Sequence, residues 1–419
     1  MTLVMTLIFA VLLVCAFPVG YALIIASGAS VMFVGSGPFV VAVLKLFQPT
    51  QSFPLLAIPF FILSGGLMMS GRLGQMLVNF AAALVGRFRG GLGQVSVIGS
   101  TVFGGVSGSA VAEASALGAM LIPWQKREGY PAAFAAAVTA SSSVIAGLIP
   151  PSIPLILYAT VSNTSIASLF MAGVVPGLML ALGMMLVCYL NGRFRNFPLL
   201  KQPGGLKAIG KTMLLAAPAL AMPIFIVVLL RFGIATPTEV SVIAVAYALV
   251  VSALVYRDLT LGRVVGALVG TVVATGIVML VIMASNLVGY VLTIEHVPTT
   301  VANWALSALQ DKWLIILAMN ILMLIIGMFL DLPAAILLLG PTFVTVGQAI
   351  GLDPIQLGIM IAVNLSIGLF TPPIGTTLFI SAAISRQPIG AIVKELVPFY
   401  MVALFVLALM SYVPAFTIY

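Results

Sequence analysis

The sequence predicts an all-α polytopic membrane protein, and its composition and apolar runs are the grounds for this prediction. The chain has 419 residues, of which 62% are hydrophobic and only 6% are charged. A soluble domain needs about 25% charged residues to cover its surface, so the surface of this chain must face an apolar medium. Apolar runs that can form helices of about 20 residues, the length that crosses a bilayer, recur along the whole chain. We expect on the order of ten to twelve spans, some of them broken.

The basic residues predict the orientation of these spans. The formal net charge is +8. Lys and Arg gather in short intervals between apolar runs, for example at 87–89, 126–127 and 257–263. Loops rich in Lys and Arg stay on the cytoplasmic side of a membrane. We therefore interpret the positive charge as a sign of which loops are cytoplasmic, and we expect no nucleic-acid partner.

The longest polar interval predicts a division of the chain into two repeats. Residues 193–211 hold five basic residues and no acidic residue. We interpret them as the loop between a first repeat, 1–192, and a second repeat, 212–419. The pattern Gly-Leu-x-x-Pro begins at Gly147 in one half and at Gly368 in the other. Paired interruptions of this kind are typical of secondary transporters built from two inverted-topology repeats.

A second helix break is expected upstream in each half. One contains the run Ser107–Ser109, and the other contains Asp331 between Gly327 and Pro333. Backbone that leaves a helix inside hydrocarbon needs other partners, and in transporters it binds ions and substrate. These hydroxyl, carbonyl and carboxylate oxygens predict two equivalent cation sites with the substrate between them. The alternatives are a Gly/Ser helix-packing motif in the first half and a helix-end acid at the membrane interface in the second.

Each half also contains a candidate re-entrant hairpin, at 54–73 and at 281–298. Small and polar residues lie in the middle of both segments, with Ser64 in the first and Asn286 in the second. We expect the substrate near these two hairpin tips. The alternative is an ordinary helix with a small-residue packing face.

The order of the motifs resembles the large membrane subunit of tripartite ATP-independent periplasmic (TRAP) transporters. The runs 58–65, 103–110, 233–239, 327–331 and 351–375 carry the resemblance, which extends over nearly the whole chain. The resemblance implies a Na⁺-coupled secondary transporter in a bacterial inner membrane. It also implies an elevator-type fold, in which a scaffold holds a mobile transport domain. The substrates of the family are organic acids such as C4-dicarboxylates, sialic acids, keto acids and sugar acids.

The resemblance and the repeat alignment together give the candidate site residues. Motif match implies Na⁺ ligands in the Ser-Gly-Ser, Asp and Thr-Pro-Pro regions, and the repeat alignment adds one glycine. The expected Na⁺ ligands, in two sites, are Ser107, Ser109, Gly147, Asp331, Gly368 and Thr371. The expected substrate-binding residues are Ser64, Ser142, Ser143, Asn286, Asn364, Thr376 and Thr377. Many members of the family have Asn where this chain has Thr377, which leaves the substrate open. Arg72 and Arg386 are the candidates for a cation that binds the substrate carboxylate.

The resemblance further implies two protein partners. One is a small membrane subunit, which we expect as a separate chain because this chain starts directly in the large-subunit pattern. The other is a soluble periplasmic substrate-binding protein, which sets much of the selectivity.

Two rival functions follow from the same residues. The run Gly105–Gly108 fits the Gly-x-Ser-Gly pattern of an intramembrane serine protease, but the nucleophile then needs a base and His296 is the sole histidine. The second rival is a proton-coupled carrier or a channel that works without a binding protein, with Asp331 and Glu113 as proton relays.

Overall fold

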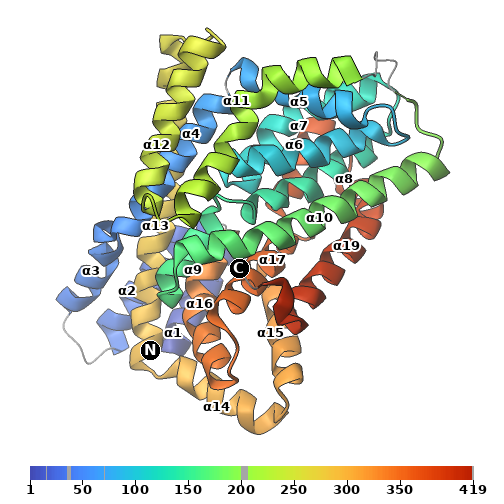
Figure 1. Ribbon diagram of the computed structural model, residues 1–419. Helices are drawn as coiled ribbons and strands as arrows, with labels where there is room; N and C mark the ends of the chain where they lie inside the picture. Colours follow the sequence, from blue (N-terminus) through green and yellow to red (C-terminus); the bar gives the residue numbers. More distant parts are fainter. Residues whose placement is uncertain (16, 35–38, 70, 200–205, 418–419) are drawn as a thin grey trace.

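The computed structural model describes residues 1–15, 17–34, 39–69, 71–199 and 206–417, and this part of the chain is helical without strands (Figure 1). Residues 200–205 of the basic loop, with Lys201, lie outside it. The first half contains α1 (Thr2–Val14), α2 (Val19–Val34), α3 (Phe39–Phe47), η1 (Gln48–Gln51), η2 (Phe53–Leu56), α4 (Ala57–Met69), α5 (Arg72–Val85), α6 (Gly91–Ser107), α7 (Ala110–Arg127), α8 (Ala132–Ser142), η3 (Ser143–Gly147), α9 (Ile153–Ser162) and α10 (Ile166–Phe194). The second half contains α11 (Leu206–Arg231), α12 (Pro237–Val250), η4 (Val251–Val255), α13 (Leu261–Ile294), α14 (Val297–Leu309), α15 (Lys312–Gly327), α16 (Leu332–Ala349), α17 (Pro354–Gly368), α18 (Thr376–Ser385), α19 (Ile389–Tyr412) and η5 (Pro414–Phe416).

Full-length spans are fewer than expected. Within the described residues six helices are long and apolar enough to cross a membrane, or seven if the bent pair Phe39–Gln51 and Phe53–Met69 is one span. The expectation of ten to twelve was too high because many apolar runs fold as helices of 10–17 residues. A helix of 15 residues is about 22 Å long, shorter than the hydrocarbon core of about 30 Å. The chain is a multi-pass inner-membrane protein in which half-length helices accompany full spans.

The two ends of the molecule differ in charge. The basic loops at 86–90 and 257–263 lie at one end, uppermost in Figure 1. There the guanidinium of Arg89 donates to the side chain of Asn196 (2.5 Å). At the other end the amino terminus pairs with Glu295 (3.3 Å). Because basic loops stay in the cytoplasm, the first end is cytoplasmic and the second is periplasmic.

All four predicted helix breaks are confirmed. α6 ends at Ser107 and α7 begins at Ala110, with Gly108 between them in the left-handed region (φ 60°). α15 and α16 are separated by residues 328–331. Both Gly-Leu-x-x-Pro runs also interrupt helix, the first between η3 and α9 and the second between α17 and α18. The Pro150–Pro151 and Pro372–Pro373 peptide bonds are cis.

Two hairpins end at the upstream breaks and enter the molecule from opposite sides. Near the cytoplasmic end the side-chain amide of Gln125, on α7, donates to the carbonyl of Leu92, on α6 (3.3 Å). Both helices therefore return to that end, and the Ser107–Ala110 turn is the hairpin tip. Near the periplasmic end the Lys312 amine, on α15, donates to the carbonyl of Gly351, just beyond α16 (3.2 Å). Opposite directions of entry are what inverted-topology repeats produce.

The hairpin tips expected near Ser64, in 54–73, and near Asn286, in 281–298, are not formed. α4 runs without a break through Ser64 and α13 through Asn286, and in the first segment helix ends only at Met69, before α5 begins at Arg72. In α4 the small residues make a packing face, as the alternative interpretation held. A Cβ atom added at Gly65 would lie only 2.9 Å from the Cα atom of Ser107, so α4 presses directly on the tip of the first hairpin.

This packing predicts opposite effects for two neighbouring glycines. Replacing Gly65 by Ala should lower stability by about 1–3 kcal/mol, because the new methyl group meets backbone at Ser107. Replacing Gly66 by Ala should be neutral or raise stability by up to about 1 kcal/mol, because the added Cβ has ordinary contact, 3.6 Å from the Ala267 Cβ, and Ala favours helix. Thermal unfolding of both variants in the same detergent measures the difference. Equal melting temperatures would contradict the close approach of α4.

The order of the helices is the same in both halves. The starts of α6 and α15, Gly91 and Lys312, are 221 residues apart, and the starts of α10 and α19, Ile166 and Ile389, are 223 apart. The three pairs between them, α7 with α16, α8 with α17 and α9 with α18, follow in the same order. This correspondence is consistent with the predicted duplication.

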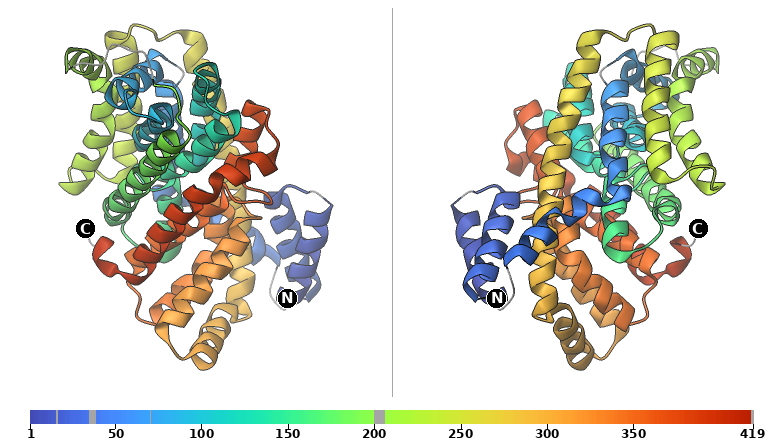
Figure 2. Two further views of the ribbon diagram at one scale, coloured as in Figure 1. Left: turned by 90° about the vertical axis from the view of Figure 1, so that its right-hand side faces the viewer. Right: turned by 90° about the vertical axis from the view of Figure 1, so that its left-hand side faces the viewer.

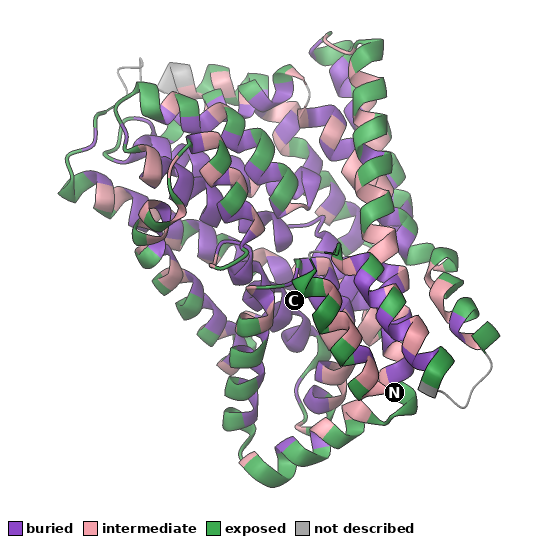
Figure 3. Ribbon diagram, turned by 180° about the vertical axis from the view of Figure 1, so that it is seen from behind, coloured by how far each residue is buried: buried purple, intermediate pink, exposed green. Residues whose placement is uncertain are grey.

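The N-terminal helices form a separate body beside the main core. Buried residues are concentrated in the interior of the broken-helix region (Figure 3). A smaller apolar cluster, with Leu23, Ala42 and Leu287 among its members, joins α2 and α3 to α13. Figure 2 shows α1–α3 packed along one side of α13. α13 therefore connects the N-terminal helices to the rest of the molecule.

Candidate ion and substrate site

In the first half, the tip of the hairpin is bonded to the interrupted crossing formed by α8, η3 and α9. The Ile153 N–H donates to the carbonyl of Gly108 (3.4 Å). Ser152 caps α9 and its hydroxyl also donates to the carbonyl of Gly147 (2.6 Å). Ser109 caps α7 by accepting the N–H of Ala112 (3.4 Å). The four helix ends around this tip thus lie within one hydrogen-bonded unit.

The second half repeats this arrangement. The Ile374 N–H donates to the carbonyl of Met328, which ties the α17–α18 break to the second hairpin tip (3.2 Å). A Cβ atom added at Gly368 would lie 2.3 Å from the carbonyl oxygen of Gly327, so the two backbones are in direct contact. The Thr371 hydroxyl donates to the carbonyl of Ile367 (2.6 Å).

The two halves meet at these breaks. A Cβ atom added at Gly147 would lie 3.1 Å from the hydroxyl oxygen of Ser366 on α17. The Thr377 hydroxyl lies between carbonyls of both halves, 3.0 Å from that of Ala140 and 2.9 Å from that of Leu369. The structure therefore brings the Gly147 and Thr371–Thr377 segments into one region, as the two-repeat interpretation requires.

Several buried oxygens in this region have no hydrogen-bond partner among the described residues. They are Asn364 Oδ1, Ser366 Oγ and Thr376 Oγ1. The amide nitrogen of Asn364 is satisfied, because it donates to the backbone and side-chain oxygens of Asn320 (3.0 and 2.9 Å). Buried polar atoms are normally paired, so each of these free acceptors is available to a bound cation or substrate. Ser366 and Asn320 were missed by the sequence analysis, since neither lies in a break.

Two acids lie close to the hairpin tips. Asp331 is the N-cap residue of α16; its side chain is exposed and makes no capping hydrogen bond. Of the three ion pairs in the described part, none involves Asp331. Glu113, on α7, is fully buried, and neither of its carboxylate oxygens has a partner among the described residues. The Ser100 hydroxyl lies beside that carboxyl but is bonded to the hydroxyl of Ser142 (2.9 Å).

The expected substrate residues fall into separate groups. Ser142, Ser143 and Thr377 are buried with their hydroxyls paired, Ser143 to the carbonyl of Ala140 (3.1 Å). Ser64 is buried in α4, where its hydroxyl donates to the carbonyl of Phe61 (2.9 Å). Asn364 and Thr376 lie with the free oxygens of the second break. Asn286 lies apart from all of these, on the periplasmic half of α13.

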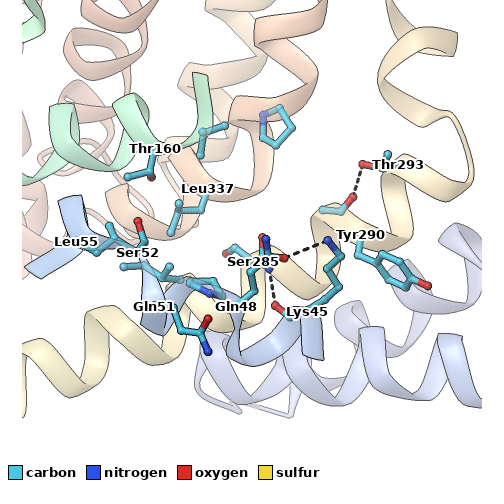
Figure 4. A pocket seen from close by; sticks show the side chains of 16 residues that line it. Lys45, Gln48, Gln51, Ser52, Leu55, Thr160, Ser285, Tyr290, Thr293 and Leu337 are labelled. Carbon is cyan, nitrogen blue, oxygen red and sulfur yellow. Dashed lines mark hydrogen bonds between the residues drawn. The ribbon is translucent and has the colours of Figure 1, made fainter. Parts of the chain in front are cut away.

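Asn286 lines a cavity between the N-terminal helices and α13 (Figure 4). This cavity has a volume of about 650 Å³ and lies between the end of α3 with η1, the periplasmic half of α13, the end of α9 and the middle of α16. Lys45, Gln48, Ser285 and Thr293 are among its polar lining residues. Arg72 and Arg386, the expected carboxylate-binding cations, are exposed at the cytoplasmic end and do not line it.

The donor set around the breaks suits a hard cation. It consists of hydroxyl, amide and carbonyl oxygens, with the carboxylate of Asp331 at the second hairpin tip and that of Glu113 near the first. No group of three or more His, Cys, Asp or Glu side chains with the geometry of a metal site occurs within the described residues. Oxygen ligands of this kind are those that hard cations prefer.

Comparison with known proteins gives the family. The family model of the tripartite ATP-independent periplasmic transporter, DctM component, matches residues 6–416. The C4-dicarboxylate TRAP transporter large permease protein DctM of Pseudomonas aeruginosa is 37% identical over 375 residues, which cover 89% of this chain and 87% of that protein. The sialic acid TRAP transporter large permease protein SiaM of Vibrio cholerae is 35% identical over 97% of this chain and 95% of that protein. A Sinorhizobium fredii protein, y4mL, is 50% identical over the full length of both.

A solved structure supports the architecture. The YdaH transporter of Alcanivorax borkumensis has a TM-score of 0.63 to this chain at 15% identity, covering 90% of this chain and 88% of that one. At this identity the likeness is one of fold. The family match and these relatives confirm the family that the sequence resemblance indicated. The chain belongs to the DctM-component family, the large membrane permeases of tripartite ATP-independent periplasmic transporters.

Proposed function

We propose that the chain is the Na⁺-coupled permease for an organic acid that a periplasmic binding protein delivers. A small membrane subunit, a separate chain, would complete the complex, and the broken-helix region would move as an elevator-type transport domain against a scaffold. The observation that carries this proposal is the meeting of both hairpin tips with both interrupted crossings, where buried oxygens lack partners. Unwound backbone at membrane depth is the usual place for coupling ions in secondary transporters.

The proposed ion ligands lie in two clusters, one for each half. Ser107, Ser109 and Gly147 belong to the first; Asp331, Gly368 and Thr371 belong to the second. Two free oxygens of α17 would supply further ligands: that of Ser366, which lies beside Gly147 of the first cluster, and that of Asn364. Two such clusters would hold two Na⁺ ions, with the substrate between them.

An organic acid is the substrate class that best fits the relatives. Two of them are named for C4-dicarboxylates and for sialic acid, both of which carry carboxylates. A carboxylate that crosses a membrane with a negative interior is opposed by the potential, by about 2.3 kcal/mol per charge at 100 mV. Symport with Na⁺ offsets this opposition.

Reconstituted uptake tests the coupling. The chain, its small subunit and its binding protein are placed in proteoliposomes, and uptake is driven either by a Na⁺ gradient or by a pH gradient. We expect uptake only with Na⁺ and only with the binding protein. Uptake that a pH gradient drives without Na⁺ or the binding protein would refute the proposal in favour of the proton-coupled carrier.

Two hydroxyl deletions test the ligand assignment. Ser107→Ala and Thr371→Ala should each raise the Na⁺ concentration for half-maximal uptake by roughly 5- to 13-fold, since each removes one ligand contact worth about 1–1.5 kcal/mol. The Na⁺ dependence of the uptake rate measures the effect. Thr345→Ala, which removes a hydroxyl bonded to the carbonyl of Pro341 in α16, is the control that should not change it. An unchanged Na⁺ response in both test variants would remove these residues from the ion sites.

A further inference from the structure

Among the described residues that line the 650 Å³ cavity, Lys45 is the one that carries a charge (Figure 4). Its amine donates to the side-chain oxygen of Gln48 (3.0 Å). It takes part in none of the three ion pairs of the described residues. Lys45 is half-buried in the last turn of α3, so its amine is accessible from the cavity. An anion that enters the cavity would meet this unpaired positive charge.

The position of Lys45 is fixed by α13. The side-chain amide of Asn286 donates to the backbone carbonyl of Lys45, although the two residues are 241 positions apart. Asn286 lies eight residues, or about 12 Å, before the periplasmic end of α13 at Ile294. Lys45 thus lies in the periplasmic half of the molecule, the side from which a binding protein releases its ligand.

The cavity also offers neutral groups for the rest of an organic acid. The hydroxyl of Ser285 is buried, with the residue 2% exposed, and has no hydrogen-bond partner among the described residues. Gln51 and Thr160 add amide and hydroxyl groups on the other walls. These groups suit the hydroxyl and carbonyl oxygens of a sugar acid or a dicarboxylate.

The cavity is also close to the proposed ion site. Leu337 on α16 lines it, six residues after Asp331, or about 9 Å along the helix. A substrate in the cavity would lie at the periplasmic entrance to the second Na⁺ cluster.

We propose that this cavity is the periplasmic binding site for the substrate carboxylate, with Lys45 as its counter-ion and Ser285 as a hydrogen-bond donor. The proposal rests on the proposed function for the identity of the anion. An anionic lipid headgroup would offer similar chemistry, so the test separates the two sources.

Thiol labelling tests the site without knowledge of the substrate. Ser52, on the cavity wall, is replaced by Cys in a chain whose exposed Cys15 is replaced by Ser; the remaining Cys188 is buried. The measured quantity is the ratio of the reaction rate of an anionic methanethiosulfonate to that of a cationic one. We expect this ratio to be roughly tenfold higher with Lys45 than after Lys45→Gln, because one unit charge a few Å away sets the local potential. Lys45→Arg should keep the preference. Reagent preferences that do not depend on residue 45 would overturn the proposal.

Uptake in defined lipids identifies the anion. With succinate and sialic acid as probes, Lys45→Gln should raise KM roughly 10- to 100-fold, whereas Lys312→Gln, at the exposed periplasmic turn, should not. The effect should be equal in phosphatidylcholine alone and in mixtures with phosphatidylglycerol. An effect confined to phosphatidylglycerol would assign Lys45 to a lipid headgroup and overturn the proposal. If uptake of either probe is driven by Na⁺ and its KM is unchanged in Lys45→Gln, the proposed site is contradicted but the proposed function is not. If uptake by the wild type does not depend on Na⁺, the proposed function itself is contradicted.

Discussion

Replacing Asp331 by Asn is expected to abolish Na⁺-driven uptake while the protein stays folded in the membrane. Asp331 is the one carboxylate at the second hairpin tip, its side chain has no capping bond, and none of the described ion pairs neutralises it. Loss of its charge removes the strongest proposed Na⁺ ligand, an effect of roughly 10- to 100-fold or more on ion affinity. The initial rate of uptake in proteoliposomes, at the Na⁺ concentration that half-saturates the wild type, is the measurement.

Asp311→Asn is the matched control for that variant. Asp311 is also an exposed N-cap aspartate, at the start of α15, but it lies at the periplasmic end and accepts the N–H of Trp313 (2.9 Å). Asn caps a helix as well as Asp does, so this variant should fold and transport normally. Wild-type Na⁺ dependence in Asp331→Asn would exclude Asp331 from the ion site.

Replacing Gly368 by Ala is expected to have the second large effect, on folding and transport together. The added methyl group would lie 2.3 Å from the carbonyl oxygen of Gly327, and backbone cannot move aside as a side chain can. The contact between the hairpin tip and the interrupted crossing should open, at a cost of about 1–3 kcal/mol or more. Melting temperature and uptake rate should therefore both fall.

Gly276→Ala in α13 provides the comparison for Gly368→Ala. No atom lies within 4 Å of a Cβ added at Gly276, so Ala should be tolerated and should stabilise the helix by about 0.5–1 kcal/mol. If both variants melt and transport alike, the backbone contact between the two breaks is absent from the working protein.

The helix breaks could be predicted because their cause is local. Gly108 occupies the left-handed region, and Pro lacks the N–H that a helix needs, so the chain must leave the helix near these residues whatever surrounds it. The same local information placed Asp331 and Thr371 at break segments. Alignment of the two halves then predicted that these break segments lie close together.

Local sequence could not show in the same way whether the chain turns at Ser64 and Asn286 or continues as helix. Small and polar residues suit both a turn and a tight helix contact, and tertiary packing decides between the two. In α4 the deciding contact is between Gly65 and Ser107, which are 42 positions apart. The cavity at Lys45 depends likewise on the hydrogen bond from Asn286, which is distant in the sequence. A single lysine near an apolar run therefore did not predict a cavity.

Binding of Na⁺ to the purified complex tests the central claim most directly, because it needs neither substrate nor binding protein. A ligand that binds only the folded state raises its stability by RT ln(1 + [L]/Kd), about 2.7 kcal/mol at 100 Kd. Na⁺, compared with choline at equal ionic strength, should raise the melting temperature of the wild type, and should raise that of Asp331→Asn by clearly less, because only the first cluster is intact in that variant. The same melting temperature in Na⁺ and choline, or an equal rise in Asp331→Asn, would contradict a cation site where the broken helices meet.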